Sequence, residues 1–209
     1  MSFGFCMRHI SSLFSIQLSR WTKLFAGLAL IGIGVAFTKQ ANLGLGPWDV
    51  LGDGLAQLTG IQLGTASILI GAIVMLIWIP MRERPGVGTL TNLLLIGAFM
   101  NLALVVIQSA GGILQQSAWL LAGLLLIGIG SVSYLASQLG AGPRDGLMLG
   151  LSRKTGWSVR LTRTAAEVTV LIAGWLLGGA VGVGTVIIAL TIGPIIQLVS
   201  RMTGEELVK

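Results

Sequence analysis

The chain has little of what soluble enzymes use for chemistry. Its 209 residues include one cysteine and one histidine, Cys6 and His9. A single cysteine excludes an intrachain disulfide, and no Cys/His cluster offers a metal site. His9 lies in the polar N-terminal stretch, so we expect no histidine-based catalyst or proton relay inside a membrane.

Charge is also scarce. Only 10% of the residues are charged, 54% are hydrophobic, and the mean hydropathy is +0.92. Such a composition is typical of a chain that lies in the lipid bilayer. The net charge of +6 comes from basic residues at the ends of apolar segments, so it predicts membrane topology rather than a nucleic-acid partner. No Gly-x-Ser-x-Gly, His-Glu-x-x-His or P-loop motif is present, so we expect no enzyme and no cofactor.

The apolar segments predict an all-α polytopic protein with six transmembrane helices. The six segments are roughly 21–38, 62–80, 86–108, 117–138, 161–178 and 183–200. Basic residues alternate between the connections, and one side of the membrane has most of them: Arg8, Arg20, Lys23, Arg82, Arg84, Arg144, Arg153, Lys154, Arg160, Arg201 and Lys209. The positive-inside rule then places both termini in the cytoplasm.

The same unit occurs twice along the chain. Residues 27–102 align with 123–198 at a constant offset of 96 and agree at 26 of 76 positions. The agreements include Gly-Pro-x-Asp, Thr-Gly and Gly-Val-Gly-Thr blocks, which a merely apolar composition does not explain. Three spans per copy is an odd number, so the second copy is predicted to be inverted relative to the first. Residues 21–108 and 117–200 are therefore expected to be two inverted three-helix repeats.

The two ends of the chain lie outside these repeats. Residues 1–20 carry apolar side chains among polar ones and predict an interfacial amphipathic segment rather than a cleaved signal peptide. Residues 201–209 are predicted to be a cytoplasmic tail.

Each copy contains a short Gly-Pro-led segment that breaks the pattern of spans, at 48–58 and 144–154. Gly46-Pro47 and Gly142-Pro143 predict a helix start, because proline at the first helical position has no N–H to leave unpaired. Asp49 and Asp145 follow two residues after each proline. One interpretation is that they cap the helix; the other is that the helix is re-entrant and its N-terminus lines a binding cavity. An interfacial helix lying flat is an equally good alternative to a re-entrant one.

The copies differ in charge, and the difference suggests a site. Arg144, Arg163 and Glu167 replace Trp48, Ser67 and Gly71 of the first copy. An ionisable residue within a span is a candidate functional residue, although Arg163 and Glu167 could also form a structural i,i+4 pair. We predict that five residues form a substrate-binding site between the repeats: Asp49, Arg144, Asp145, Arg163 and Glu167.

Several motifs resemble the YczE-like bacterial integral membrane proteins, which are related to the YitT type. They are the stretches 45–51, 64–68, 82–86, 142–147 and 159–167, and the resemblance covers about residues 24–200. It implies a small polytopic protein of the inner membrane, and it brings no substrate with it.

Two classes of function fit these features. A secondary transporter or exporter of a small solute, with an anion as one option, explains the repeat and the few charges within spans. A non-transporting membrane regulator or assembly partner is the alternative. A homo-oligomer is compatible with both.

Overall fold

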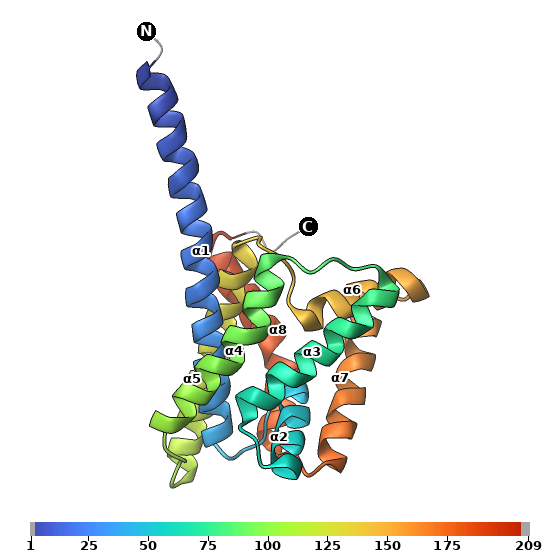
Figure 1. The fold of residues 1–209 in the computed structure, drawn as a ribbon. Coiled ribbons are helices and arrows are strands. Elements are labelled where there is room, and N and C mark those ends of the chain that lie inside the picture. The colour runs from blue at the N-terminus through green and yellow to red at the C-terminus, as the bar shows by residue number, and fades with distance from the viewer. Residues whose placement is uncertain (1–2, 206–209) are drawn as a thin grey trace.

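The computed structural model describes residues 3–205, and the side chains of residues 17–205 (Figure 1). This part of the chain is all-helical and contains no β-strand. Its eight helices are α1 (Phe3–Gln40), α2 (Pro47–Thr59), α3 (Leu63–Met81), α4 (Val87–Val106), α5 (Ile113–Ala136), α6 (Pro143–Thr155), α7 (Val159–Leu176) and α8 (Val183–Thr203).

The helix boundaries follow the sequence repeat. Helices α6, α7 and α8 start at Pro143, Val159 and Val183, each 96 residues after the start of α2, α3 and α4. The short helices α2 and α6 also end 96 residues apart, and each has a left-handed glycine after it, Gly60 with φ 76° and Gly156 with φ 74°. The same local signals therefore give the same elements in both copies.

Among the described residues, five helices are long and apolar enough to cross a membrane. They are Gln17–Gln40 of α1, Leu63–Met81, Val87–Val106, Ile113–Ala136 and Val183–Thr203. The sixth expected span, 161–178, corresponds to α7, which is not among these five. It carries Arg160, Arg163 and Glu167 within 18 residues, and three charges lower its mean hydropathy.

The predicted interfacial segment 1–20 continues into the first span as one helix, α1. Its side chains up to residue 16 and the tail 206–209 lie outside the described residues. Its place at the membrane surface stays a prediction.

The first helices of the two copies pack directly against each other. A Cβ on Gly27 would lie 2.6 Å from the carbonyl oxygen of Gly130, and one on Gly123 would lie 2.7 Å from that of Gly34. Gly27 and Gly123 are repeat counterparts, as are Gly34 and Gly130. The contacts are therefore reciprocal, and small residues let the two backbones of α1 and α5 meet.

The loops before the short helices make a second reciprocal contact. Gly184 N–H donates to Leu43 O at 2.7 Å, and Gly88 N–H donates to Leu139 O at 2.8 Å. The Gly-Val-Gly-Thr block at the start of α4 or α8 therefore receives the loop of the other copy. Glycine is required at this point, since a Cβ on Gly88 would lie 2.7 Å from the Leu139 carbonyl carbon.

The short helices also pack on the opposite copy: α2 on α7, and α6 on α3. The copies differ in how their last two helices pack. Helix α3 packs on α4, whereas α7 and α8 make little contact with each other. Gly64 lets α3 approach α4 so closely that its Cβ would lie 2.0 Å from Gly97 O. The counterpart of Gly64 is Arg160, and the counterpart of Gly97 is Gly193, which has nothing within 4 Å of its Cβ position.

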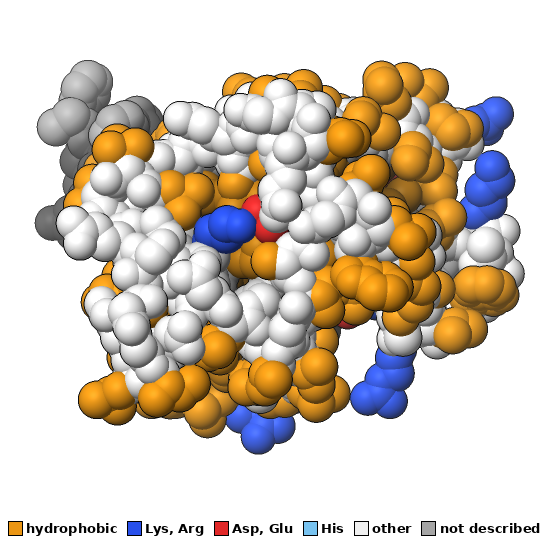
Figure 2. All heavy atoms as spheres, turned by 90° about the horizontal axis from the view of Figure 1, so that it is seen from below, with side chains coloured by type: hydrophobic (Ala, Val, Ile, Leu, Met, Phe, Trp, Pro, Cys, Tyr) orange, Lys and Arg blue, Asp and Glu red, His pale blue; other side chains and the backbone are white. Residues whose placement is uncertain are grey.

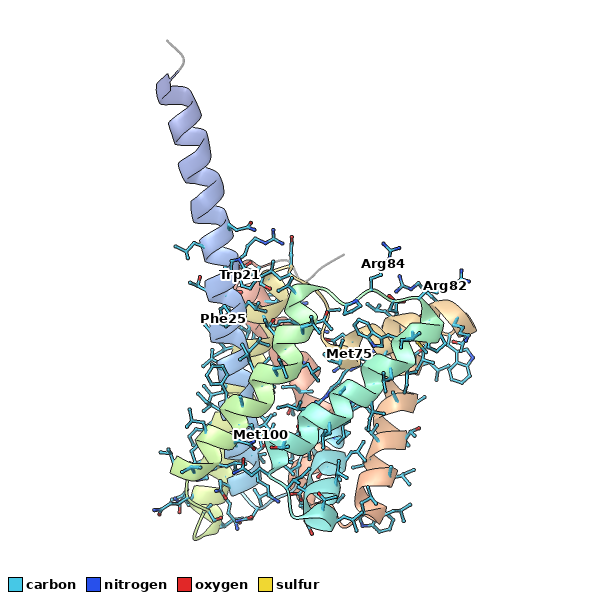
Figure 3. All side chains as sticks on the ribbon, viewed as in Figure 1. Trp21, Phe25, Met75, Arg82, Arg84 and Met100 are labelled. Atoms are coloured by element: carbon cyan, nitrogen blue, oxygen red, sulfur yellow. The ribbon has the colours of Figure 1, made fainter. Side chains whose placement is uncertain are left out.

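The bundle has two different ends. Lys23 of α1 forms an ion pair with Glu205, so the start of the first span and the chain's C-terminal part lie at the same end (Figure 1). Arg82 and Arg84 lie toward this end as well (Figure 3). Seen from the opposite end, hydrophobic side chains and several basic ones lie around the edge, and a basic and an acidic side chain lie next to each other near the centre (Figure 2).

Candidate functional site

The site begins with the two Gly-Pro turns. Gly46 and Gly142 hold extended N-cap conformations, and Pro47 and Pro143 take the first helical positions. Both N-caps are glycines and have no side chain that could cap the helix. The start of each helix carries the positive end of the helix dipole.

Both turns line one cavity of about 470 Å³, within the size range of small-molecule sites. Its walls come from both copies. All nine residues that the sequence singled out line it: Gly46, Pro47, Asp49, Gly142, Pro143, Arg144, Asp145, Arg163 and Glu167. We call it the central cavity. The structure thus brings together residues that lie up to 121 positions apart, from Gly46 to Glu167.

Asp49 and Arg144 connect the copies across this cavity. Arg144 Nη2 donates to Asp49 Oδ1 at 3.3 Å. The guanidinium carbon of Arg144 also lies 5.3 Å from the centre of the Trp48 ring, a cation–π geometry. Asp49 is 8% exposed. Its ion-pair partner, Arg144, comes from the other repeat.

Asp145 occupies the equivalent position without an ion pair. No basic nitrogen of the described residues lies within ion-pair distance of its carboxylate. Its Oδ2 folds back toward Gly142 and lies 3.2 Å from the position that a Cβ would take there. Asn92 Nδ2 and Tyr134 Oη lie 3.2 Å and 3.3 Å from the same point. Polar atoms of α4, α5 and α6 therefore all lie next to Gly142.

Arg163 and Glu167 form the i,i+4 pair that the sequence allows. Arg163 Nε donates to Glu167 Oε1 at 2.9 Å, and the side chains are 49% and 27% exposed. Both line the central cavity on the side where α7 and α8 stand apart. Pairing does not remove them from the cavity, so the structural and the functional interpretations are compatible.

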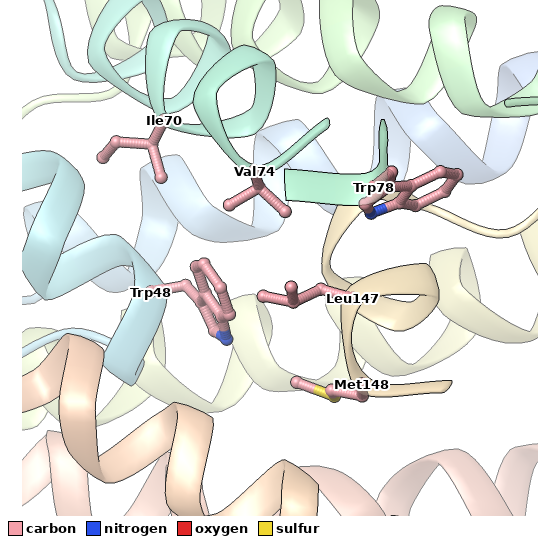
Figure 4. Packing of buried hydrophobic residues seen from close by; sticks show 6 residues of the cluster. All are labelled: Trp48, Ile70, Val74, Trp78, Leu147 and Met148. Carbon is pink, nitrogen blue, oxygen red and sulfur yellow. The ribbon is translucent and has the colours of Figure 1, made fainter. Parts of the chain in front are cut away.

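A buried apolar cluster lies beside the cavity, and two of its residues, Trp48 and Met148, line the cavity. Trp48, Ile70, Val74, Trp78, Leu147 and Met148 form a buried cluster from α2, α3 and α6 (Figure 4). Trp78 Nε1 donates to the carbonyl of Pro143 at 3.1 Å and so fixes the start of α6. Trp48 Nε1 is buried and has no hydrogen-bond partner in the described chain.

A polar cluster that the sequence did not single out lies around Asp53. Its carboxylate accepts from Lys39 Nζ at 2.5 Å, from Gln57 Nε2 at 3.0 Å and from Ala180 N–H at 3.0 Å. Asp53 is 2% exposed. This Asp53 cluster connects the end of α1 and the middle of α2 to the loop before α8. A second cavity of about 280 Å³ lies beside it and is lined by Lys39, residues 42–45 and residues 180–183.

The two aspartates of α2 do not lie on an exposed face. Asp49 and Asp53 are both buried, whereas Leu58 is 68% exposed. Both aspartates lie in the protein interior. The sequence contains one signal for the role of Asp53. Asp49 and Asp53 lie on successive turns of the helix, and the counterpart of Asp53 in the second copy is the apolar Leu149.

The sequence did not predict several other residues that line the cavity. They are Trp48, Ser67, Asn92, Ser131, Tyr134 and Gln197. Asn92 and Gln197 could have been noticed as amides within apolar spans, because polar side chains in a span tend to face the bundle interior.

A bundle of apolar helices around one polar, charge-lined cavity defines a polytopic α-helical membrane protein. Residues 18–201 match the family model described as "Family of unknown function (DUF6198)". The chain is 38% identical over 187 residues to an uncharacterized protein of Haemophilus influenzae, covering 90% of this chain and 86% of that one. It is 37% identical over 180 residues to the uncharacterized membrane protein YczE of Bacillus subtilis, covering 85% and 84%. The uncharacterized protein YyaS of the same organism is 27% identical over 165 residues, covering 77% and 82%.

The chain belongs to this family of YczE-like membrane proteins. No solved structure matches it. The resemblance noted in the sequence is confirmed.

Proposed function

We propose that this protein is a secondary transporter or exporter of a small solute, built from two inverted repeats, with its binding site in the central cavity. The observation that carries the proposal is the cavity itself. It lies between the two copies and is lined by both Gly-Pro helix starts and by five aspartate, glutamate and arginine side chains. Binding sites between repeats, at the N-termini of broken helices, are typical of such transporters.

The inverted arrangement is supported by the reciprocal contacts. Gly27 meets Gly130 while Gly34 meets Gly123, and the loop–helix hydrogen bonds at Leu43 and Leu139 repeat in the same exchanged manner. A two-fold relation between the copies produces contacts of this kind. We further propose that α7 is the sixth span, because Arg163 and Glu167, two of its three charged residues, line the cavity. The protein then lies in the bacterial inner membrane with both termini in the cytoplasm.

The proposed function makes α2 and α6 re-entrant helices. Irregular backbone at membrane depth is stable only where protein or a water-filled cavity surrounds it. The buried aspartates of α2 and the cavity at both helix starts fit that condition. No enzymatic step is part of this proposal.

The first test compares extracellular and intracellular metabolites between a deletion strain and an overexpressing strain. A transporter should change the distribution of at least one solute across the membrane, and that solute should then exchange in proteoliposomes that contain the purified full-length chain. A membrane regulator would change metabolite levels in cells without moving any solute in proteoliposomes. That second result would contradict the proposed function.

A further inference from the structure

The central cavity carries polar groups of two opposite kinds that the protein leaves unused. On one side are hydrogen-bond donors. Trp48 Nε1 is buried and unpartnered in the described chain, and Trp48 as a whole is 7% exposed. In Figure 4 its indole nitrogen lies at the edge of the ring that is turned away from Ile70 and Val74. A buried N–H without an acceptor is costly, so this donor indicates a place for an acceptor atom of a bound molecule.

Arg144 strengthens this donor side. Its guanidinium has five N–H donors, and in the described protein it makes one side-chain hydrogen bond, at 3.3 Å to Asp49. Its guanidinium carbon lies over the Trp48 ring, 5.3 Å from the ring centre. The Gly-Pro starts of α2 and α6 line the same cavity. Together these groups match a carboxylate, which accepts two parallel hydrogen bonds from a guanidinium.

The second kind of group is acidic. The ionisable residues that line the cavity, apart from Tyr134, are three carboxylates and two guanidiniums: Asp49, Asp145, Glu167, Arg144 and Arg163. Asp49 and Glu167 have ion pairs, and Asp145 has none within the described residues. The cavity therefore has one carboxylate in excess, which disfavours a solute of net negative charge.

Neither a plain anion nor a plain cation satisfies both sides. An anion would pair with Arg144 and Trp48 and would lie near the unpaired Asp145. A cation would pair with Asp145 and would leave the indole N–H without an acceptor. A solute with an ammonium next to a carboxylate satisfies both kinds of group, and the apolar residues that line the cavity, Trp48 and Met148 of Figure 4 among them, would cover its side chain.

We infer that the substrate class is a small amino-acid-like zwitterion. Its carboxylate is held by Arg144, by Trp48 Nε1 and by the first turn of α2, and its ammonium is held by Asp145. Ser67 Oγ, which is also buried without a partner in the described chain and lines the same cavity, contributes a further polar contact. This inference rests on the proposed function, because it names the substrate of the same cavity.

The test measures binding to the purified full-length chain by thermal shift and by tryptophan fluorescence, and measures exchange in proteoliposomes. The probes are alanine, leucine and glutamine, with N-acetyl-leucine as the anion-only analogue and leucinamide as the cation-only analogue. At least one zwitterion should bind. If leucine binds, each of its two analogues should bind at least about tenfold more weakly, because each analogue lacks one charge-assisted contact. If another probe binds, its own N-acetyl and amide derivatives take their place.

Two variants test the contacts. Trp48→Phe removes the indole N–H and keeps the aromatic surface, and Arg144→Lys keeps the charge and removes the planar pair of donors. Each should weaken binding of the zwitterion about tenfold while its melting temperature stays near that of the wild-type chain. Trp175→Phe and Arg160→Lys are matched controls at exposed positions outside the cavity, and they should bind as the wild type does.

The outcomes separate the substrate class from the function. Equal binding of an analogue and its parent zwitterion, unchanged binding by both cavity variants, or no binding by any probe to the folded protein would overturn the substrate class. If a solute without an ammonium–carboxylate pair exchanges in proteoliposomes, the class is wrong and the transporter stands. If no solute exchanges at all, the proposed function itself is wrong.

Discussion

At the scale of single residues, the repeat explains which polar groups have partners. Asp49 and Asp145 occupy equivalent positions, but the residue that precedes each differs: Trp48 in the first copy and Arg144 in the second. The one arginine pairs with the aspartate of the other copy. Duplication followed by a single change of Trp to Arg, or the reverse, is therefore enough to leave one aspartate paired and the other available.

The Asp49–Arg144 pair should couple the two repeats. We expect Asp49→Asn and Arg144→Gln each to lower the melting temperature in detergent, because each leaves a partly buried charge without its partner. The double variant should lose less than the sum of the two, with a coupling energy of roughly 1 kcal/mol. Additive losses in this double-mutant cycle would mean that the 3.3 Å contact contributes nothing to stability.

At the scale of helices, the close packing of α3 on α4 depends on glycines that the pair α7 and α8 has only in part. Gly64 and Gly97 bring α3 against α4, and their counterparts Arg160 and Gly193 leave α7 apart from α8. An arginine side chain cannot fit where a Cβ would already lie 2.0 Å from a backbone oxygen. The separation of α7 from α8 on this side of the cavity therefore follows from one difference between the copies, Gly64 in the first and Arg160 in the second.

Gly97→Ala and Gly193→Ala test this account as a matched pair. A Cβ on Gly97 would lie 2.4 Å from Gly64 O, so we expect this variant to lose roughly 1–3 kcal/mol or more of stability. Gly193 has nothing within 4 Å, and alanine is the better helix former, so this variant should be unchanged or slightly more stable. Thermal unfolding in the same detergent measures both. Equal losses would show that α7 and α8 pack as α3 and α4 do.

The Asp53 cluster gives a second prediction at this scale. Asp53→Leu should cost about 3 kcal/mol, because it leaves Lys39 without its partner at a largely buried position. The second copy has Leu135 and Leu149 at the positions equivalent to Lys39 and Asp53. The double variant Lys39→Leu/Asp53→Leu should therefore recover much of the loss. Urea or thermal unfolding measures the recovery, and a double variant less stable than Asp53→Leu alone would contradict the prediction.

At the scale of the whole molecule, local signals predicted the elements and could not predict all of their partners. The short helices were expected at 48–58 and 144–154 and are observed at Pro47–Thr59 and Pro143–Thr155, because proline, glycine and helix periodicity act within a few residues. The gathering of five charged residues was expected from the repeat. The pairing of Lys39 with Asp53 was not, since it depends on how α1, α2 and the loop before α8 meet in space.

The last prediction concerns the orientation of the repeats in the membrane. Gln115 lies in the first turns of α5 and Lys154 in the last turn of α6, and both are exposed. Single cysteines at these positions, in a Cys6→Ser background, should react with a membrane-impermeant maleimide from opposite sides of the inner membrane. The physical reason is that basic residues gather at the end of the bundle that holds Arg82 and Arg84 (Figure 3), and basic loops stay in the cytoplasm. Arg84→Cys is the control for that end and should react from the same side as Lys154→Cys. Labelling of Gln115→Cys and Lys154→Cys from one side would rule out two inverted repeats, because α5 alone separates Gln115 from the Gly-Pro turn of the second copy.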